Sequence, residues 1–468
     1  MRTWILAAAL MTAGCGAKSG LMLGQGQGAE GGSGGTPADT GGPGGSGGAG
    51  GSGGIAGTGG SGAGGTAGIG GSGGTTQTAC SALVERETRT IATMPEYQMS
   101  FPKFVQTTGG PVTLAYRMDP LGVDGSWTKL AHVSFDAWGS WDGQQSLGQG
   151  WLGCAFAGES FALGPDRDGG FAFLVSTDDP ASPEPGLYLG RGHPAGFNSD
   201  TELHSAQPAQ PLAVSHDGVS LLLAYARDYG GEFRLSLSGQ AGMASVVFPT
   251  LGCASMPLQA DAIPFDGGFL LAVSTSKDPG YCDFAELPVG PPDRIQILRV
   301  WTTGDTGFEV VVEIPSDGYV ERMRLVPRGN EGAWLAWQTV TEVNPSAIRA
   351  VRLNAKGELY SKWNDLPTDG YFMLPEAVTN LGERLATAVI DAYDPSIPQI
   401  LVQLHDDEDG PVALSHVVSP PADQWPVGPI ALLGSPQANS LLLAWTGVDM
   451  SGGMQPNHIY VRRLDCVE

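Results

Sequence analysis

Seven short apolar segments recur between residues 113 and 445, and each ends in a valine or an aromatic residue. Successive copies end 59, 50, 48, 64, 52 and 56 residues apart, a spacing near the length of a four-stranded propeller blade. Because both alternating faces of each segment are apolar, these anchor strands are predicted to be buried on both sides. Their final residues are Tyr116, Val175, Tyr225, Val273, Trp337, Val389 and Trp445.

A second strand follows each anchor strand, and apolar and polar residues alternate along it. The alternation indicates one buried and one solvated face. Such a strand should lie further from the centre of the same sheet than the anchor strand. The clearest copies begin at Ile295, Ile348, Ile400 and Ile459, and weaker copies begin near Lys129, Leu187 and Phe233.

The repeats predict an all-β fold for residues 80–468, a seven-bladed β-propeller with six or eight blades as alternatives. Prolines and glycines separate the strands, and no interval shows a sustained helical period of 3.6 residues. Strand-like sequence after the second strand, such as Glu358 to Trp363, would form the outer strand of a blade. The competing interpretation is an irregular pair of β-sandwiches whose repeats are coincidental.

The two ends of the repeat array predict how the ring closes. The chain stops at Glu468 soon after the last second strand, whereas residues 83–92 precede the first repeat and have no blade of their own. In a closed ring this segment can supply the missing outer strand of the last blade and cover an open sheet edge. Cys80 and Cys466 would then meet, and we expect a disulfide between them.

The remaining cysteines of this domain allow a second pair. Cys282 lies in the longest insertion, and Cys253 lies in the loop before the anchor strand of the same blade. We expect these two to pair, which leaves Cys154 over. A buried thiol is favoured for Cys154 over a reactive nucleophile, since no base stands beside it in the sequence.

The chain begins with an export signal. Arg2 is followed by an apolar run from Trp4 to Ala13, which is too short to span a bilayer. The Thr-Ala-Gly-Cys tetrad ending at Cys15 resembles the lipobox of bacterial lipoproteins, although Thr12 replaces the usual leucine. The resemblance implies that residues 1–14 are removed and that Cys15 receives a diacylglycerol and a fatty acyl chain such as palmitate. An ordinary signal peptide with an incidental cysteine is the alternative.

A glycine-rich segment separates this signal from the repeats. Residues 16–79 contain 30 glycines in 64 positions, and such a segment cannot offset the entropy of ordering. We expect residues 15–79 to be a lipidated, disordered tether spanning about 40 to 50 Å. The residue after the cysteine is Gly16 rather than aspartate, and in this the chain resembles lipoproteins that are sorted to the outer membrane. The expected location is therefore the outer membrane or the cell surface, with the domain outside the cytoplasm.

The charge of the repeat domain narrows its partners. Without Arg2, Lys18, Glu30 and Asp39, residues 80–468 carry 22 basic and 46 acidic side chains, a net charge of 22 − 46 = −24. Such a surface repels nucleic acid and anionic lipid headgroups. We therefore expect no nucleic-acid partner, and contact with the membrane only through the lipid anchor.

Motifs for catalysis or metal binding are weak. The seven histidines stand singly, without the spacing of a zinc site. The acidic turns His405 to Gly410 and Asp166 to Gly169 lack the full set of oxygens of a calcium loop. Ser134 to Gly139 nearly matches the Asp-box of sialidase propellers, but no second copy follows. We predict no catalytic residue, no metal ligand and no cofactor.

Tryptophans are the remaining candidates for a sugar-binding face. Trp334, Trp337 and Trp445 belong to anchor strands and are expected in the core. The tryptophans outside the anchor strands are freer to meet a ligand. They are Trp138, Trp141, Trp151, Trp363 and Trp425.

Nearly the whole chain resembles lipoproteins of Gram-negative bacteria that carry a Gly/Ser-rich tether and repeats of this kind. The match rests on LLLAW at Leu441 to Trp445 followed by IYVRRLD at Ile459 to Asp465, and it implies a propeller without implying a substrate. Two functions remain. The favoured one is a non-catalytic, monomeric surface module that binds a protein or glycan at a face of the ring. The alternative is an extracytoplasmic hydrolase of glycans or peptides, for which three or more convergent polar side chains with shifted pKa values in the central mouth would argue.

Overall fold

A computed structural model of the chain describes most of the repeat domain. The region before residue 80, and with it Cys15, lies outside the described residues. No helix in the described part of the chain is long and apolar enough to cross a membrane. The described ranges are 80–91, 97–106, 111–120, 129–136, 140–147, 161–177, 186–193, 196–197, 202–207, 209–227, 232–239, 242–248, 256–276, 294–302, 307–316, 319–328, 331–340, 347–360, 364–366, 377–391, 399–406, 412–435, 439–449 and 458–467.

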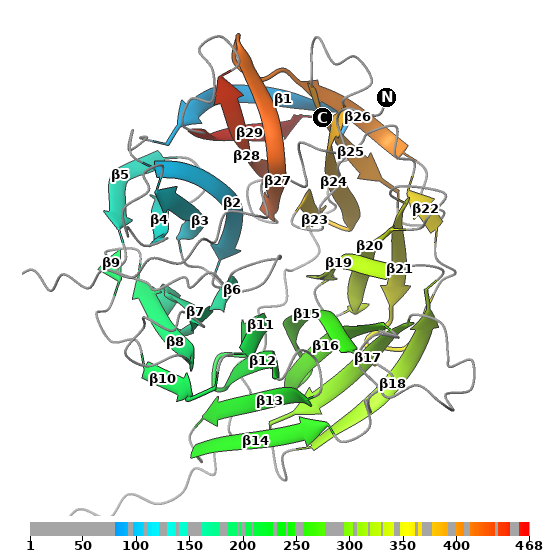
Figure 1. The fold of residues 1–468 in the computed structure, drawn as a ribbon. Helices are drawn as coiled ribbons and strands as arrows, with labels where there is room; N and C mark the ends of the chain where they lie inside the picture. The colour runs from blue at the N-terminus through cyan, green and yellow to red at the C-terminus, as the bar shows by residue number, and fades with distance from the viewer. Residues whose placement is uncertain are drawn as a thin grey trace, which may run out of the picture.

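The described strands form seven antiparallel sheets arranged as blades around a central axis (Figure 1). The fold is therefore a seven-bladed β-propeller, and the alternatives of six or eight blades and of a sandwich pair are wrong. The innermost strands are β2 (Tyr97–Gln106), β6 (Phe161–Pro165), β11 (Ala209–His216), β15 (Met256–Phe265), β19 (Tyr319–Pro327), β23 (Val378–Leu381) and β27 (Gln424–Ser435).

The anchor strands predicted from the sequence are the second strands of the blades, and the alternating strands are the third. The second strands are β3 (Val112–Pro120), β7 (Phe171–Thr177), β12 (Leu221–Arg227), β16 (Gly268–Ser276), β20 (Ala333–Val340), β24 (Arg384–Asp391) and β28 (Ser440–Asp449). The third strands are β4 (Lys129–Asp136), β8 (Gly186–His193), β13 (Glu232–Gly239), β17 (Arg294–Trp301), β21 (Ala347–Leu353), β25 (Gln399–His405) and β29 (His458–Val467).

A short outer strand completes each blade. In the fifth blade the assigned outer strand is β22, which begins after the predicted segment Glu358 to Trp363. Within that segment Leu359 forms an isolated bridge to Leu353, and residues 361–363 lie outside the described residues. The outer strands are β5 (Ser140–Leu147), β10 (Glu202–Ser205), β14 (Gly242–Phe248), β18 (Gly307–Pro315), β22 (Asn364–Leu366), β26 (Val412–Val418) and β1 (Ala82–Thr90), with β9 (Gly196–Phe197) beside β8 and the single turn η1 (Arg167–Gly169) between β6 and β7.

The hydrophobic core is divided among the joints between blades. The described residues form seven apolar clusters, and each cluster joins two neighbouring blades. In β12, Leu223 and Tyr225 pack against the second blade, whereas Leu222 and Ala224 pack against the fourth. The apolar character of the anchor strands on both faces follows from this arrangement, because each blade is covered by two neighbours.

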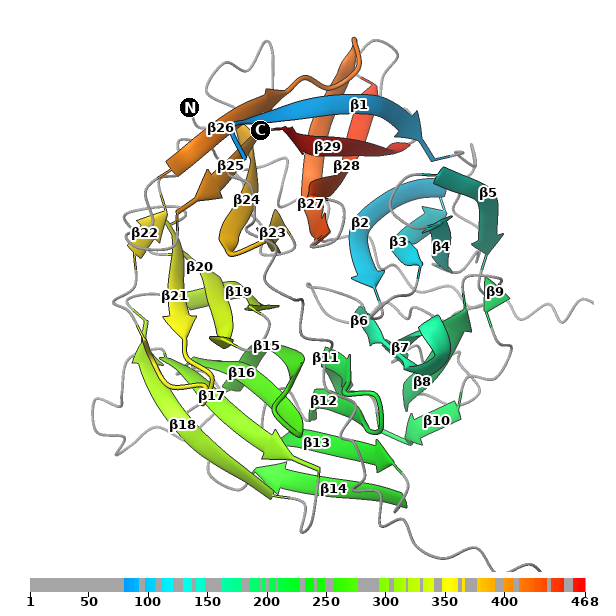
Figure 2. The same ribbon diagram turned by 180° about the vertical axis from the view of Figure 1, so that it is seen from behind.

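Strand β1 closes the ring. It pairs antiparallel with β29, with Leu83 opposite Cys466 and Thr90 opposite Tyr460, and the two strands lie side by side at the rim in both views (Figure 2). A disulfide joins Cys80 to Cys466 across 386 residues of chain, with the Cα atoms 5.4 Å apart. The N-terminal strand thus completes the blade built from the C-terminal residues.

The innermost strands of neighbouring blades approach one another closely. A Cβ atom added to Gly434 of β27 would lie 1.6 Å from the carbonyl oxygen of Asn380, which belongs to the sixth blade. A Cβ on Gly164 of β6 would likewise lie 2.0 Å from the carbonyl oxygen of Val214 in β11. Glycine is required at these positions because the backbone of the next blade occupies the space of a side chain. The centre of the ring is therefore narrow.

The closing disulfide should contribute strongly to stability. Replacing both cysteines by serine (Cys80→Ser with Cys466→Ser) should lower the free energy of unfolding by about 2 to 5 kcal/mol, since the bond restricts the unfolded chain across a very long loop. Urea unfolding under oxidising conditions measures the loss. Non-reducing peptide mapping of the wild-type chain provides the control, and recovery of either thiol in free form would contradict the closure.

Candidate functional site

The innermost strands of six blades place one residue each at the same depth around the ring. In each blade we take the residue that precedes the final residue of the anchor strand, such as Ala115 before Tyr116. The inner-strand residues paired with these positions are called the channel level. Three of these residues are alanines and three are charged. The channel level consists of Lys103, Ala162, Ala213, Asp261, Arg324 and Ala431.

β-Bulges precede the polar residues of this region. The register of the inner strand shifts in β2, β11, β15, β19 and β27. The first paired residue after the shift is Lys103 in β2, Gln259 in β15 and Arg322 in β19. A bulge turns the following side chains and is common beside functional sites. The bulges of β15 and β19 lie at the same level, so Gln259 and Arg322 are equivalent, whereas Lys103 follows its bulge two positions further along the ladder.

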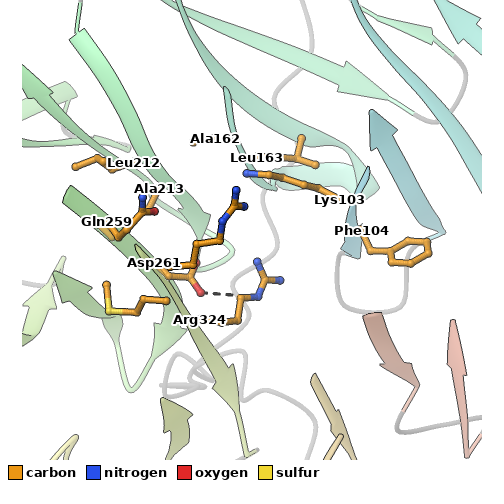
Figure 3. Close-up of a pocket in the computed structure, with 12 residues that line it drawn as sticks. Lys103, Phe104, Ala162, Leu163, Leu212, Ala213, Gln259, Asp261 and Arg324 are labelled. Carbon is orange, nitrogen blue, oxygen red and sulfur yellow. Dashed lines mark ion pairs between the residues drawn. The ribbon is translucent and has the colours of Figure 1, made fainter. Parts of the chain in front are cut away.

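A small cavity lies between these strands. Its volume is about 40 Å³, which is space for about three water molecules. Figure 3 shows Lys103 extending into the cavity from β2, and Asp261 facing Arg324 from the opposite side. The residues lining it are Lys103, Phe104, Ala162, Leu163, Leu212, Ala213, Gln259, Ala260, Asp261, Arg322, Met323 and Arg324.

Asp261 is the carboxylate of this cavity. Its Oδ2 accepts a hydrogen bond of 2.7 Å from the backbone N–H of Leu325, and its Oδ1 accepts one of 3.0 Å from the N–H of Ala262. Burial raises the pKa of Asp261, although Arg324 at 3.8 Å, these hydrogen bonds and the charge of Lys103 act in the opposite direction. Because Lys103 acts on Asp261 from another blade, the charged groups around the cavity interact across it.

Lys103 also connects two blades. Its Nζ donates a hydrogen bond of 3.2 Å to the carbonyl oxygen of Phe161 and lies 5.0 Å from the centre of the Phe161 ring. The bond joins β2 to β6 as the bond from Leu325 to Asp261 joins β19 to β15. Lys103 and Asp261 therefore stabilise the ring as well as line its centre.

The cavity differs in charge from the rest of the protein. Its described lining includes three cations, Lys103, Arg322 and Arg324, and one carboxylate, Asp261, a net charge of 3 − 1 = +2. The whole chain has a net charge of −24. A positive centre within an acidic molecule can hold a small anion, because guanidinium and ammonium groups donate strong hydrogen bonds to oxyanions.

In each of the two acidic turns singled out in the sequence, one described aspartate forms an ion pair. Asp166 is buried and pairs with Arg191 at 3.1 Å, while His216 lies 4.0 Å from its other oxygen. In the second turn, Asp406 pairs with Arg384 at 3.1 Å, and residues 407–411 lie outside the described residues. These contacts join strands of the blades.

The histidines and the Asp-box segment do not converge. Among the described residues, no three histidine, cysteine, aspartate or glutamate side chains gather to hold a metal ion. His405 lies in the core, where its Nε2 is 2.9 Å from the Thr387 hydroxyl. Burial lowers the pKa of His204 and of His216. Of the Asp-box segment, residues 134–136 belong to β4, and residues 137–139 lie outside the described residues.

The three tryptophans expected in the core are there: Trp334, Trp337 and Trp445 are buried at the joints between blades. Trp425 is half-buried in β27, and Trp141 belongs to β5. The expected cysteine pair and several freer tryptophans cannot be placed. Cys253, Cys282, Cys154, Trp138, Trp151 and Trp363 lie outside the described residues.

Sequence reasoning missed the charged residues of the channel. The inner strands lack the uniform apolar pattern of the anchor strands, and three of the six residues at the channel level are alanines. A detectable signal is positional: Lys103, Asp261 and Arg324 occupy equivalent places in three repeats. An alignment of the segments that precede the anchor strands would have placed these three charged residues in one column.

No protein-family model and no curated protein matches the chain. Among solved structures, a protein of unknown function from Dyadobacter fermentans is 13% identical, with a TM-score of 0.42 over 82% of this chain and 99% of that one. A subtype N10 neuraminidase-like protein of A/little yellow-shouldered bat/Guatemala is 10% identical, with a TM-score of 0.37 over 83% and 100%. An α-L-arabinofuranosidase from Lactobacillus brevis is 11% identical, with a TM-score of 0.33 over 54% and 90%. The assignment of the fold rests on the sheet order of the chain itself.

The raised pKa of Asp261 predicts a specific dependence of stability on pH. The folded state favours the neutral acid, so the stability from this group is greatest below its unfolded pKa of about 3.9 and is lost as the pH rises through its raised folded value. Asp261→Asn removes the charge and keeps one acceptor oxygen, so one of the N–H groups of Leu325 and Ala262 loses its acceptor. That loss is the same at every pH and does not change the slope of stability with pH. The variant should therefore gain stability relative to the wild type as the pH rises from about 4 to neutrality, measured by urea unfolding at several pH values.

A matched control is Asp465→Asn. Burial raises the pKa of Asp465, but hydrogen bonds from Arg86 and Arg463 outweigh burial and hold it below its usual range. The stability that Asp465 contributes is present above its unfolded pKa. The difference in free energy of unfolding between the wild type and Asp465→Asn should therefore stay constant between about pH 5 and 7 and shrink at lower pH. Equal profiles for the two aspartates would contradict the assignment at Asp261.

Proposed function

We propose that this protein is an exported lipoprotein that presents its propeller as a binding module for a protein or glycan outside the cytoplasm. The single observation that carries the proposal is the junction between tether and ring. Strand β1 begins at Ala82, directly after the glycine-rich segment, and lies at the outer rim. A tether attached at the rim leaves the central cavity accessible to a partner.

The closing disulfide supports export. Structural disulfides persist in the periplasm and outside the cell, whereas cytoplasmic thiols are kept reduced. The bond joins Cys80, just before β1, to Cys466 in β29, the strand that pairs with β1. Such a bond agrees with the signal and the lipobox-like tetrad ending at Cys15.

The centre of the ring supports binding as the role of the domain. Polar side chains from β2, β15 and β19 converge there on a cavity with a positive net charge. Of the described lining side chains, the pKa of Asp261 is shifted. Converging polar groups in a concave site are typical of ligand recognition. A partner would meet them at the end of the channel.

Labelling with palmitate tests the anchor. Wild-type chain expressed in Gram-negative cells should incorporate the label and fractionate with the outer membrane, and Cys15→Ser should do neither. Cys154→Ser is the matched control and should keep both properties. Labelling of the Cys15→Ser variant, or a soluble wild-type chain, would contradict the proposal.

A ligand screen tests the binding role. The purified mature chain should retain a protein or glycan in a pull-down and glycan-array screen, without hydrolysing glycans or peptides from the same panel. Chain denatured with its disulfide reduced serves as the control for nonspecific adhesion. Turnover of a retained ligand by the wild type would favour the hydrolase instead.

A further inference from the structure

We infer that a groove on the fourth blade binds a neutral sugar residue of a glycan, with Trp301 as the surface on which the sugar ring stacks. The inference rests on the proposed function and deepens it, because it names the class of ligand and the place where the module would bind it. The groove has a volume of about 250 Å³. The described residues that line it are Asp266, Gly267, Arg299 and Trp301.

The groove lies at the inner hairpin of the fourth blade, beside the end of the third strand. Asp266 and Gly267 form the turn between β15 and β16, and Trp301 is the last residue of β17. Arg299 stands two positions before Trp301, so both side chains leave β17 on the same face. The fourth blade lies across the ring from β1 (Figure 1). The groove is therefore on the other side of the ring from the strand that follows the glycine-rich segment.

Glycine stands beside Trp301 on both neighbouring strands. Trp301 pairs with Gly268 of β16 and with Gly307 of β18. A Cβ atom added to Gly307 would lie 2.9 Å from Nε1 of Trp301 and 3.1 Å from its Cε2, so the indole lies over this glycine. No directly paired side chain covers the indole, and Trp301 stays partly exposed. Within the described part of the chain, no group accepts a hydrogen bond from its Nε1–H.

The propeller repeat does not require an aromatic residue at this position. Trp301 follows Val300, which pairs with Phe269, the residue four places before the end of the anchor strand. The other six blades carry a polar residue or glycine at the equivalent place. These residues are Asp136, His193, Gly239, Asn354, Asp406 and Asp465. A large, partly exposed aromatic side chain that the repeat does not require is better explained by recognition than by packing.

An ion pair supplies polar groups next to the indole. Nη2 of Arg299 donates a hydrogen bond of 2.5 Å to Oδ2 of Asp266. The Asp266 side chain is 70% exposed, and no described residue donates to its Oδ1. Oδ1 is thus an acceptor for a hydroxyl group, and the remaining N–H groups of Arg299 are donors. A flat apolar surface with donors and an acceptor beside it matches a sugar ring, which has a face of C–H groups and an edge of hydroxyl groups.

Hydrogen bonds to the third blade hold the groove in position. Thr302 directly follows Trp301, and its hydroxyl lies 3.1 Å from Oδ2 of Asp217 and 3.3 Å from the carbonyl oxygen of Gly267. Asp217 belongs to the turn between β11 and β12, where its Oδ1 accepts two backbone N–H groups. Because the end of β17 is fixed before a ligand arrives, little conformational entropy is lost on binding.

The charge and size of the groove favour a neutral pyranose with equatorial hydroxyls, such as a glucose or N-acetylglucosamine residue. Such a ring presents C–H groups to the indole and hydroxyls to the polar groups at its edge. Asp266 and Arg299 cancel each other's charge, and the chain has a net charge of −24, so an acidic glycan would be repelled. The volume of about 250 Å³ is below the roughly 300 to 1,000 Å³ of sites that enclose a drug-sized ligand. One sugar residue would enter the groove while the rest of the glycan stayed in solvent.

Titration calorimetry of the purified mature chain with tetrasaccharides tests the class of ligand. Cellotetraose and acetylated chitotetraose are neutral probes with equatorial hydroxyls, and tetragalacturonate is an anionic probe of the same length. We expect at least one neutral probe to bind and tetragalacturonate not to bind. Absence of binding by both neutral probes, or equal binding of tetragalacturonate, would overturn the inference.

Variants of the groove locate the binding. Trp301→Ala should weaken binding of the neutral probe by about tenfold or more, since tryptophan contacts often carry much of a binding free energy. Gly307→Ala keeps every side chain of the groove but places a Cβ atom against the indole, so it should also weaken binding. The matched control is Trp425→Ala, because Trp425 is half-buried in β27 of the last blade. Thermal unfolding checks that each variant is folded.

Tryptophan fluorescence gives a readout that a folding defect alone does not produce. The neutral probe should change the emission of the wild type and of Trp425→Ala when it covers the indole of Trp301. The same change should be absent from Trp301→Phe, which keeps an aromatic ring and should bind with intermediate affinity. A full emission change in Trp301→Phe would place the sugar elsewhere on the molecule.

The outcomes separate this inference from the proposed function. Equal weakening by Trp425→Ala, or unchanged affinity in both Trp301→Ala and Gly307→Ala, would exclude the groove as the site. A protein or glycan from the screen that binds wild type and Trp301→Ala equally would leave the binding module intact and overturn only the sugar site. Loss of palmitate labelling in the wild type would remove the lipoprotein proposal without changing the calorimetric result.

Discussion

Each blade of this propeller depends on its neighbours, because both faces of its anchor strand are apolar and only the adjacent sheets cover them. The described residues form one apolar cluster at every joint. A ring that opened at one joint would expose two such faces at once. Closure by β1 and the disulfide from Cys80 to Cys466 therefore protects all the other joints, since the ring has no end from which unpacking can begin.

Closure also determines where the functional parts lie. The strand that follows the glycine-rich segment is held in the last blade at the rim, so the start of the described chain is separated from the centre of the ring. Neighbouring inner strands come into close contact at Gly164 and Gly434, and a small cavity lies between inner strands of the first five blades. Within it, Lys103 and Asp261 join neighbouring blades through hydrogen bonds. The same interactions that hold the ring together thus position the charges around the cavity.

Much of the fold could be predicted because its main constraint repeats in the sequence. Burial on both faces gives an apolar pattern such as Leu441 to Trp445, and a half-solvated strand alternates as in Ile295 to Trp301. The inner strands were not predicted because their side chains contact the neighbouring blades, the backbone of other inner strands or the cavity. Hydrophobic and polar residues therefore follow no regular period along these strands. The outer strand after Leu353 was misplaced because residues 355–357 form a turn and Leu359 then forms a single bridge to Leu353, while β22 begins at Asn364. Short edge strands have few contacts that constrain their sequence.

The sequence by itself predicted seven blades, the adjacent anchor and alternating strands of each blade and the closing pair of cysteines, because each follows from local periodicity and from which segments lack a partner. Only the tertiary structure decided that Lys103, Asp261, Arg322 and Arg324 share one cavity. These residues come from three blades, up to 221 positions apart. Lys103 and Asp261 are each the single charge of their strand, whereas Arg322 and Arg324 share β19. The meeting of all four depends on the curvature of the ring and on the bulges of the inner strands, which no local pattern of hydrophobic and polar residues specifies.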